Sequence, residues 1–379
     1  MKKILFVTND FGPRTGGIES FIMGLVERLP RNSVTVFTSS QGDTTSYDAK
    51  WRADYGVEVI RDRTKMLLPT PRVARALKTI VRQNDFSVAC FGAAAPLGLL
   101  AATLRKAGIA RIVSLTHGHE VWWAKVFPFS LAIRRIGDTV DALTYLGEFT
   151  HRNISLALSL KAQKAMVRIA PGIDVAHFMP ESQPSHLRDE LGLSQKSVIV
   201  SVGRLVPRKG QDRLIEALPL IAKAIPNVHL LLVGEGSYRK TLEKLVDEKK
   251  VGDLVTFVGR VAYTQLPNYF RCGDIFAMPS RSRMAGLEVE GLGIVYLEAS
   301  ACGLPVIAGN SGGAPDAVVD GVTGIVVDGN NVNEIAAAIV RVLSDPKKMK
   351  AMGSAGSEWV RSGWAWEIWS EKFAQLLGV

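Results

Sequence analysis

The amino-acid sequence predicts an α/β protein made of two doubly wound domains in tandem. The chain has 379 residues, which is too many for one ordinary domain and about right for two. Short apolar, β-rich runs alternate with helical segments almost from end to end, a pattern typical of parallel sheets covered by helices on both faces. The alternation stops once, at a polar, proline-bearing stretch over residues 180–184, and then restarts.

The first domain is expected over residues 1–170, the second over 171–362. A C-terminal helix over 363–379 is expected to pack back on the first domain, because the apolar stripe of Trp366, Trp369 and Phe373 has to be buried. The predicted strands are 3–8, 34–38, 57–61, 87–91, 111–115 and 142–146, followed by 197–202, 229–233, 255–258, 275–278, 305–308 and 324–327. Such sheets bind ligands beyond the carboxyl ends of their strands.

The composition narrows the class of protein. Hydrophobic residues make up 47% of the chain, enough for sizeable cores. Cys90, Cys272 and Cys302 are too few and scattered for a disulfide framework or a zinc site, and they fit a reducing cytoplasm. The apolar start ends at Thr8, too early for a secretory signal, and the most apolar window, 88–104, contains Pro96 and falls short of a membrane span.

The positive charge is concentrated in the first half of the chain. The net charge is +10, but residues up to Arg168 contain 24 Lys plus Arg and 13 Asp plus Glu, a balance of +11. This asymmetry suggests an anionic partner for the first domain: a membrane surface, a nucleic acid or an acidic substrate. Solubility alone explains it equally well. Nucleic acid is disfavoured, because no recognisable reading element accompanies the charge.

Familiar nucleotide motifs are missing, but three elements suit phosphate. The sequence has no Walker-type loop and no complete dinucleotide fingerprint, which counts against a kinase and a dehydrogenase. Gly16 and Gly17 precede a predicted helix, where free amides could meet an anion. Arg204 and Lys209 follow the first strand of the second domain, a planar fork beside a point charge. A plain turn and solvated surface charge are the alternatives.

The third element is a helix start between Glu290 and Glu298. Good capping residues are absent there, so an oxyanion such as a diphosphate, or water, is expected to meet the first amides. The chain contains no Asp-x-Asp pair, so metal-assisted departure of a diphosphate lacks its usual ligands. The positive charge is expected from Arg204, Lys209 and the helix end instead.

Two histidines follow a predicted strand of the first domain. His117, His119 and Glu120 lie at the end of the strand over 111–115, where a hydrogen-bonding or acid–base role is expected for His117. A metal cluster lacks further ligands of matching spacing, and a buried structural histidine is the remaining alternative.

Together these motifs resemble the retaining glycosyltransferases of the GT-B fold, specifically family four. The N-terminal Gly-Gly-Ile-Glu, the Val-Gly-Arg and Lys-Gly element and the Glu-x7-Glu pattern all look like that family, over essentially the whole chain. The run from Arg281 to Gly293 resembles the actinobacterial mannosyltransferases that extend phosphatidylinositol mannosides from GDP-mannose. The likeness is greatest to members that add mannose to phosphatidylinositol monomannoside through an α-1,6 linkage.

The resemblance implies roles for individual residues. Gly16 and Gly17 approach the donor diphosphate, Arg204 and Lys209 neutralise it, and Glu298 and Glu290 hold the ribose and the sugar ring. His117 contacts the transferred sugar near its 6-hydroxyl. Further donor contacts are implied at Gly293, Ile294 and Val295 for the diphosphate and at Arg260, Val261 and Tyr263 for the base. No metal or other cofactor is implied, and the leaving phosphate takes the acceptor proton.

The resemblance also places a lipid acceptor on the first domain. A phosphoinositide-type acceptor implies peripheral attachment to the anionic inner face of the plasma membrane, which suits the basic first half. The expected membrane and acceptor residues are Arg72, Arg75, Lys78, Arg82, Trp122 and Trp123, although core packing explains the tryptophans equally well. Two alternatives remain: a soluble sugar or inositol-phosphate acceptor for the same fold, and a non-catalytic sugar-nucleotide-binding protein.

Overall fold

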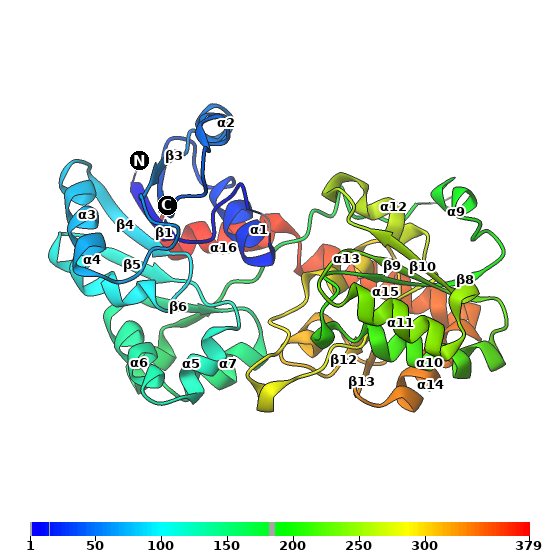
Figure 1. The fold of residues 1–379 in the computed structure, drawn as a ribbon. Coiled ribbons are helices and arrows are strands. Elements are labelled where there is room, and N and C mark those ends of the chain that lie inside the picture. Colours follow the sequence, from blue (N-terminus) through cyan, green and yellow to red (C-terminus); the bar gives the residue numbers. More distant parts are fainter. Residues whose placement is uncertain (1, 15, 182–185) are drawn as a thin grey trace. The chain divides into compact units, whose positions relative to one another are not determined.

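The computed structural model describes residues 2–14, 16–181 and 186–379 of the chain (Figure 1). These residues form two compact units, each built around one parallel sheet. The first unit comprises Met1–Gly172 and Trp366–Val379, and the second comprises Ile173–Ala365. Of the polar stretch predicted at 180–184, residues 182–184 lie outside the described part of the chain.

The first unit contains a seven-stranded sheet in the order β3-β2-β1-β4-β5-β6-β7, with every neighbouring pair parallel. Its central strands are apolar and buried on both faces, as expected for a sheet covered on both sides. The strands are β1 (Lys3–Thr8), β2 (Val34–Thr38), β3 (Glu58–Arg61), β4 (Phe86–Phe91), β5 (Arg111–Ser114), β6 (Ala142–Tyr145) and β7 (Met166–Arg168).

The second unit contains a six-stranded sheet in the order β10-β9-β8-β11-β12-β13, also parallel throughout. Its strands are β8 (Ser197–Val202), β9 (Val228–Val233), β10 (Val255–Gly259), β11 (Ile275–Met278), β12 (Val306–Gly309) and β13 (Gly324–Val327). All twelve predicted strands are present, and their ends agree with the structure to within one residue. The short edge strand β7 was not predicted, because three half-exposed residues give no usable alternation.

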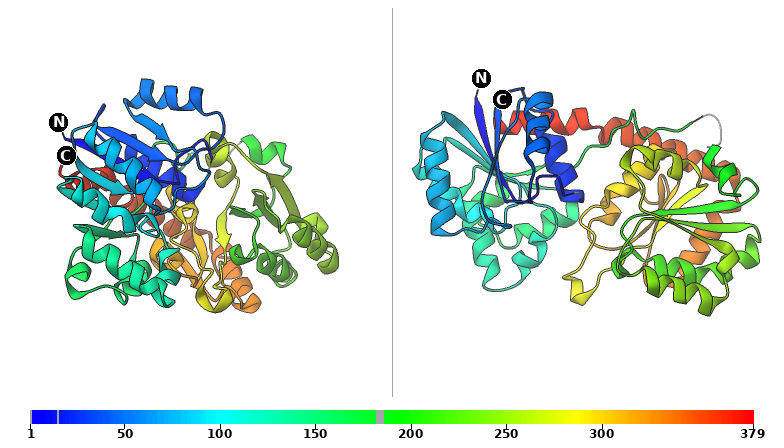
Figure 2. Two further views of the ribbon diagram at one scale, coloured as in Figure 1. Left: turned by 60° about the vertical axis from the view of Figure 1, so that its left-hand side comes forward. Right: turned by 45° about the horizontal axis from the view of Figure 1, so that its top comes forward.

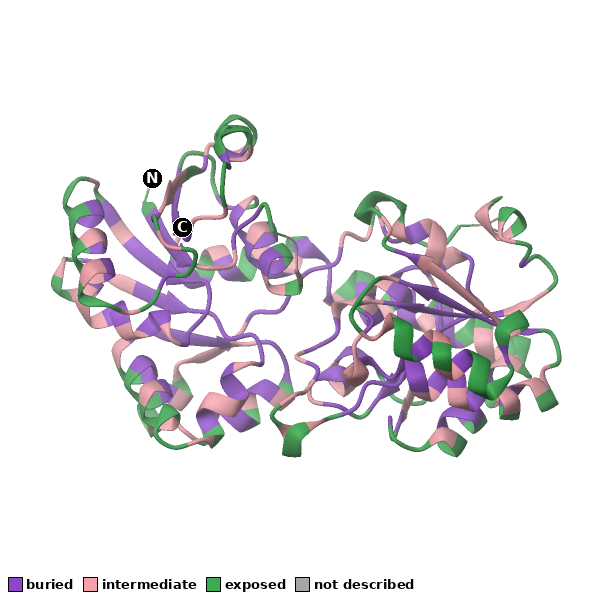
Figure 3. Ribbon diagram, in the orientation of Figure 1, coloured by how far each residue is buried: buried purple, intermediate pink, exposed green. Residues whose placement is uncertain are grey.

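Helices lie on both faces of each sheet, as Figure 2 shows, and their buried stripes face the strands (Figure 3). The first unit has α1 (Gly17–Val26), α2 (Thr45–Tyr55), α3 (Pro71–Arg82), α4 (Ala101–Lys106), α5 (Glu120–Lys125), α6 (Phe129–Thr139), α7 (Glu148–Ser155), α8 (Leu160–Lys164) and α16 (Trp366–Leu377). The second unit has α9 (His186–Glu190), α10 (Gln211–Ala224), α11 (Arg239–Lys249), α12 (Leu266–Arg271), α13 (Ile294–Ala301), α14 (Val332–Leu343) and α15 (Pro346–Gly363).

The C-terminal helix packs within the first unit. The ring of Phe373 lies 6.3 Å from that of Phe6 on β1, and the Lys2 Nζ donates to the Gly378 carbonyl at 2.8 Å. α16 begins at Trp366, three residues after the predicted start at 363, because Gly363 ends α15 and the Trp364 carbonyl accepts a hydrogen bond from the Ile173 amide.

Each sheet reverses its strand order at one point. The reversal lies between β1 and β4 in the first unit and between β8 and β11 in the second. The loops that leave two such strands diverge, so a crevice opens at the carboxyl edge of the sheet. The candidate residues of each unit are therefore expected around these two points.

Candidate functional site

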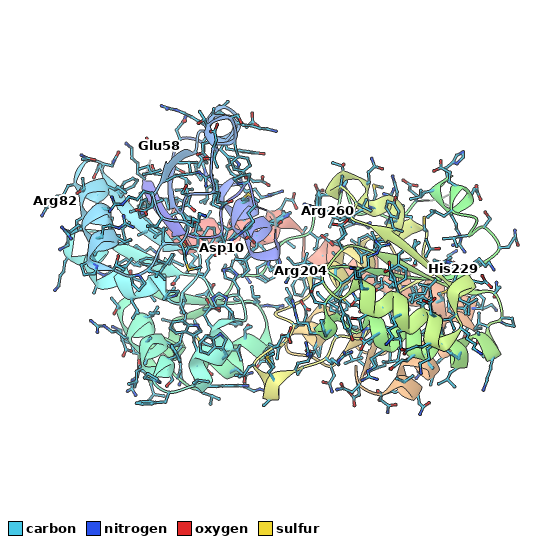
Figure 4. The ribbon with its side chains drawn as sticks, in the orientation of Figure 1. Asp10, Glu58, Arg82, Arg204, His229 and Arg260 are labelled. Atoms are coloured by element: carbon cyan, nitrogen blue, oxygen red, sulfur yellow. The ribbon has the colours of Figure 1, made fainter. Side chains whose placement is uncertain are left out.

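Arg204, labelled in Figure 4, lies in the loop between β8 and α10, at the reversal point of the second sheet, and Lys209 lies in the same loop. Arg204 is exposed, whereas Lys209 is 8% exposed. The loop closes at Gly210, whose φ is +78° and where an added Cβ would lie 2.1 Å from the Pro279 carbonyl oxygen after β11. Only glycine allows the two loops to approach this closely.

Lys209 forms a buried ion pair with Glu290. The Lys209 Nζ lies 2.9 Å from the Glu290 Oε2, and the Arg208 Nε lies 3.8 Å from the same oxygen. Burial acts to raise the pKa of Glu290, but the attraction of Lys209, Arg208 and Arg204 outweighs it and holds the pKa below its ordinary value. Glu290 is therefore ionised, and three cations surround it.

Glu290 is held at this edge by backbone contacts. Its carbonyl accepts a hydrogen bond from the Gly313 amide at 2.8 Å, and its amide donates to the Ser311 hydroxyl at 3.4 Å. At Gly293, with φ of +81°, an added Cβ would lie 2.4 Å from the Tyr296 ring. Glycine is therefore required where the chain turns into α13.

α13 begins without a side-chain cap, as the sequence predicted. Gly293 occupies the cap position and the helix starts at Ile294, followed by Val295. The first amides of such a helix and its dipole favour an anion. Glu298 lies one turn further along and is half-buried. Burial raises its pKa to about 7, and Lys209 partly offsets this rise.

The predicted base-reading residues lie on a different loop, after β10. Arg260, labelled in Figure 4, and Tyr263 are exposed, and Val261 is half-buried. The His177 ring stacks on Tyr263 with centroids 5.1 Å apart, and its Nε2 lies 3.2 Å from the Tyr263 carbonyl oxygen. His177 was not singled out from the sequence, because 86 residues separate it from Tyr263.

In the first unit, His117 and Glu120 are buried at the carboxyl edge of the sheet. Glu120 accepts hydrogen bonds from the amides of His117 at 2.9 Å and Ala94 at 3.2 Å. Burial acts to raise the pKa of Glu120, but His119 and His117 outweigh it and lower the pKa. The His119 Nε2 lies 3.2 Å from the Glu120 Oε1. The three-residue motif is thus one connected cluster.

The protonation of His117 follows from its surroundings. Its Nε2 lies 2.5 Å from the Gly92 carbonyl oxygen, which can only accept, so Nε2 carries a proton. Burial lowers the pKa of His117 despite the attraction of Glu120. The neutral ring therefore keeps Nδ1 as an acceptor. Among the residues that the structure describes, no group of three His, Cys, Asp or Glu side chains is arranged to hold a metal ion.

Gly16 and Gly17 lie at the start of α1, beside the end of β1. Space is open around Gly17, but an added Cβ at Gly16 would lie 2.3 Å from the Glu19 carboxylate. The Glu19 Oε1 accepts a hydrogen bond from the Arg14 Nε at 2.7 Å. Asp10 lies in the same loop (Figure 4), and burial raises its pKa although His117 acts to lower it.

The basic face predicted on α3 is split by the structure. Arg75, Lys78 and Arg82 are exposed. Arg72 instead donates two hydrogen bonds to Asp62, at 2.7 and 2.8 Å, which holds the pKa of that carboxyl well below its usual range. Its charge is thus largely neutralised within the unit.

Trp122 and Trp123 are half-buried on α5. Each ring centroid lies 4.9 Å from that of Phe129, and Trp123 also packs against the core. The exposed apolar side chains of this region follow them: Phe127 is 77% and Leu131 is 56% exposed. Within the described ranges, no helix is long and apolar enough to cross a membrane.

Three residues of the second site were missed by sequence reasoning. Arg208 reaches Glu290, and Arg281 pairs with Asp212. Arg208 immediately precedes Lys209 in the sequence and could have been included. The pairing of Arg281 with Asp212 joins residues 69 apart, and local spacing carries no signal for it.

Two family models match consecutive parts of the chain. Residues 15–177 match the glycosyltransferase family 4 model, and residues 185–359 match the model of group 1 glycosyl transferases. The chain is 43% identical over 376 residues to the GDP-mannose-dependent α-(1-6)-phosphatidylinositol monomannoside mannosyltransferase of Mycolicibacterium smegmatis, covering 99% of this chain and 98% of that one. It is 42% identical over 379 residues to a Corynebacterium glutamicum enzyme that is described as acting on the monoacylated acceptor, covering 99% and 98%.

Solved structures share the architecture. Anabaena Alr3699/HepE in complex with UDP aligns over 99% of both chains with a TM-score of 0.82 at 22% identity. The predicted GT-B fold is thereby confirmed. The full-length relatives and both matched models show that the chain belongs to glycosyltransferase family four, in the branch that includes these monomannoside mannosyltransferases.

Proposed function

We propose that the chain is a retaining mannosyltransferase that transfers mannose from GDP-mannose to phosphatidylinositol monomannoside through an α-1,6 linkage. Full-length identity to the mycobacterial and corynebacterial enzymes carries this proposal. The carboxyl edge of the second sheet supports it, because the cations of the loop after β8 and the uncapped amides of α13 suit the negative charge of a diphosphate. The second unit would bind the donor, and the first unit would bind the acceptor.

The donor diphosphate would bind where the cations gather. Arg204 and Lys209 would neutralise it, and the first amides of α13, at Ile294 and Val295, would meet its oxygens. Arg208 would add a third positive charge. Lys209 would pass from Glu290 to the phosphate, which frees the Glu290 carboxylate for hydroxyls of the sugar.

The remaining donor contacts are proposed from where the residues lie in each unit and, for His117, from the protonation of its ring. Glu298 would accept hydrogen bonds from the ribose hydroxyls, and the exposed loop of Arg260, Val261 and Tyr263 would meet the base. In the first unit, Gly16 and Gly17 would approach the diphosphate. The neutral His117 would use its Nδ1 to accept a hydrogen bond from the 6-hydroxyl of the transferred sugar.

The reaction itself would need no group beyond these. The bond from the sugar's anomeric carbon to the diphosphate oxygen breaks while the acceptor oxygen bonds the same face of that carbon. The acceptor proton passes to the departing diphosphate, whose growing negative charge the cations stabilise. No metal is required in this scheme, because Arg204, Arg208 and Lys209 supply the positive charge.

The direct test is transfer of labelled mannose. We expect label from GDP-mannose in a lipid product when phosphatidylinositol monomannoside is present, and undiminished transfer in EDTA. UDP-glucose and soluble inositol phosphate serve as the competing donor and acceptor. Label only in the soluble fraction would assign a different acceptor, and loss of activity in EDTA would overturn the metal-free scheme. No turnover with any pair would favour a binding protein.

The ion pair gives a sharper prediction within the same assay. Lys209→Ala is expected to lower kcat/KM by about 10²–10³, the usual loss for a group that stabilises developing charge. Glu290→Ala is also expected to nearly abolish transfer, because it removes the proposed partner of the sugar hydroxyls. Lys244→Ala, which removes an exposed cation of the same unit, should leave the rate unchanged. Circular dichroism checks that each variant is folded. Near-normal transfer by either site variant would refute its assigned role.

The raised pKa of Glu298 predicts that the affinity for the donor depends on pH. With a pKa of about 7, its carboxyl is mostly protonated at pH 6 and mostly ionised at pH 8. The ionised form is the stronger acceptor for ribose hydroxyls, so the KM for GDP-mannose should fall by up to about tenfold as the pH rises from 6 to 8. Glu298→Gln should remove this slope. If the variant kept it, another group would be responsible.

Attachment to the membrane forms part of the proposal. Arg75, Lys78 and Arg82 would face anionic headgroups, at roughly 1 kcal/mol per residue, and Trp122 and Trp123 would support the exposed apolar side chains nearby. Replacing the three cations by serine should weaken sedimentation with phosphatidylinositol-containing vesicles and reduce its salt sensitivity. The matched control replaces Lys240, Lys244 and Lys249 of the second unit. Equal binding by both triple variants would rule out the α3 face.

A further inference from the structure

Arg281 and Asp212 form a two-bond ion pair at the reversal point of the second sheet. Arg281 follows β11, and Asp212 lies in the first turn of α10. The Arg281 Nη1 donates to the Asp212 Oδ1 and the Nη2 to the Oδ2, each at 2.8 Å. The two side chains are 9% and 10% exposed. This planar geometry fixes orientation as well as distance.

Further contacts extend the pair to the cation-bearing loop. The Arg281 amide donates to the Arg208 carbonyl at 2.8 Å, and the Tyr238 hydroxyl donates to the Asp212 Oδ2 at 3.3 Å. Gly210 passes so close to the Pro279 carbonyl that a side chain would not fit. The loop after β8 and the loop after β11 are therefore held together on both sides of Lys209.

We propose that the Arg281 side chain is a positioning group for the donor diphosphate, acting through Asp212 at the start of α10 on the segment that carries Lys209. Its own charge is satisfied by Asp212, so it orders the loop and leaves the ligand to its neighbours. The inference rests on the proposed function, because it assumes that a diphosphate binds at this edge. It adds a residue for which no role followed from the sequence.

The same unit contains a matched pair at the opposite edge of the sheet. The Arg188 Nη1 and Nη2 donate to the two carboxylate oxygens of Asp274 at 3.1 and 3.0 Å. Asp274 immediately precedes β11, whereas Arg281 follows it. Loss of either pair removes a similar interaction, but only the Arg281 pair adjoins the loop of Lys209. The Arg188 pair therefore serves as a control for stability.

The test compares GDP with guanosine as ligands of the full chain in titration calorimetry. The ratio of their affinities isolates the contribution of the diphosphate. Arg281→Met is expected to reduce this ratio by about tenfold and to leave the guanosine affinity unchanged, because displacing the loop would cost about one hydrogen bond from its cations to the diphosphate. Arg188→Met should lower the unfolding temperature but keep the ratio.

A double variant separates positioning from stability. Arg281→Met alone leaves the Asp212 charge buried without its main partner, whereas Arg281→Met with Asp212→Asn removes both charges. The double variant should regain much of the lost unfolding temperature while the affinity ratio stays low. If the ratio recovered with the unfolding temperature, or fell equally in Arg188→Met, Arg281 would serve stability alone and the proposal would be overturned.

UDP and uridine titrated in parallel make the result independent of the base. A chain that binds the diphosphate but transfers no mannose from GDP-mannose would refute the proposed function and leave the role of Arg281 intact. A wild-type chain in which neither nucleotide gains affinity over its nucleoside would overturn the role of Arg281 directly.

Discussion

The parallel arrangement of both sheets is the constraint on which the candidate sites depend. Parallel strands all end at the same edge, so residues far apart in sequence gather there once the strand order is set. In the second unit this brings Lys209, after β8, to Glu290, in the loop that follows β11. In the first it brings His117, after β5, to the Gly92 carbonyl, after β4. The helices that cover both faces leave this edge as the place where polar groups collect.

Burial then decides the protonation of these groups. A carboxylate withdrawn from water is costly unless cations compensate, and the two glutamates of the second unit show both outcomes. Glu290 lies beside Lys209 and stays ionised, whereas Glu298 has weaker compensation and its pKa rises to about 7. His117 is neutral for the same reason. Residues of one type thus acquire different chemistry from their neighbours.

The sequence predicted the fold nearly completely, because buried parallel strands give strong apolar runs. It also selected Arg204, Lys209, Glu290 and Glu298, although not Arg208, since strand ends and helix starts are visible in the pattern. It could not predict which charges pair. The sequence predicted Arg72 as part of a basic face, but Asp62, ten residues earlier, neutralises its charge. The partnership of Arg281 with Asp212 and the raised pKa of Glu298 depend on three-dimensional packing, which spacing along the chain does not encode.

The charge balance of the second site matches the ligand proposed for it. Arg204, Arg208 and Lys209 face one ionised carboxylate, Glu290, which leaves an excess of two positive charges. The Arg281–Asp212 pair adds none. A sugar-linked diphosphate carries about two negative charges at neutral pH, so its arrival would neutralise the edge. Until then Glu290 offsets part of the repulsion among the cations, and its pairing with Lys209 keeps the loop in place for the exchange.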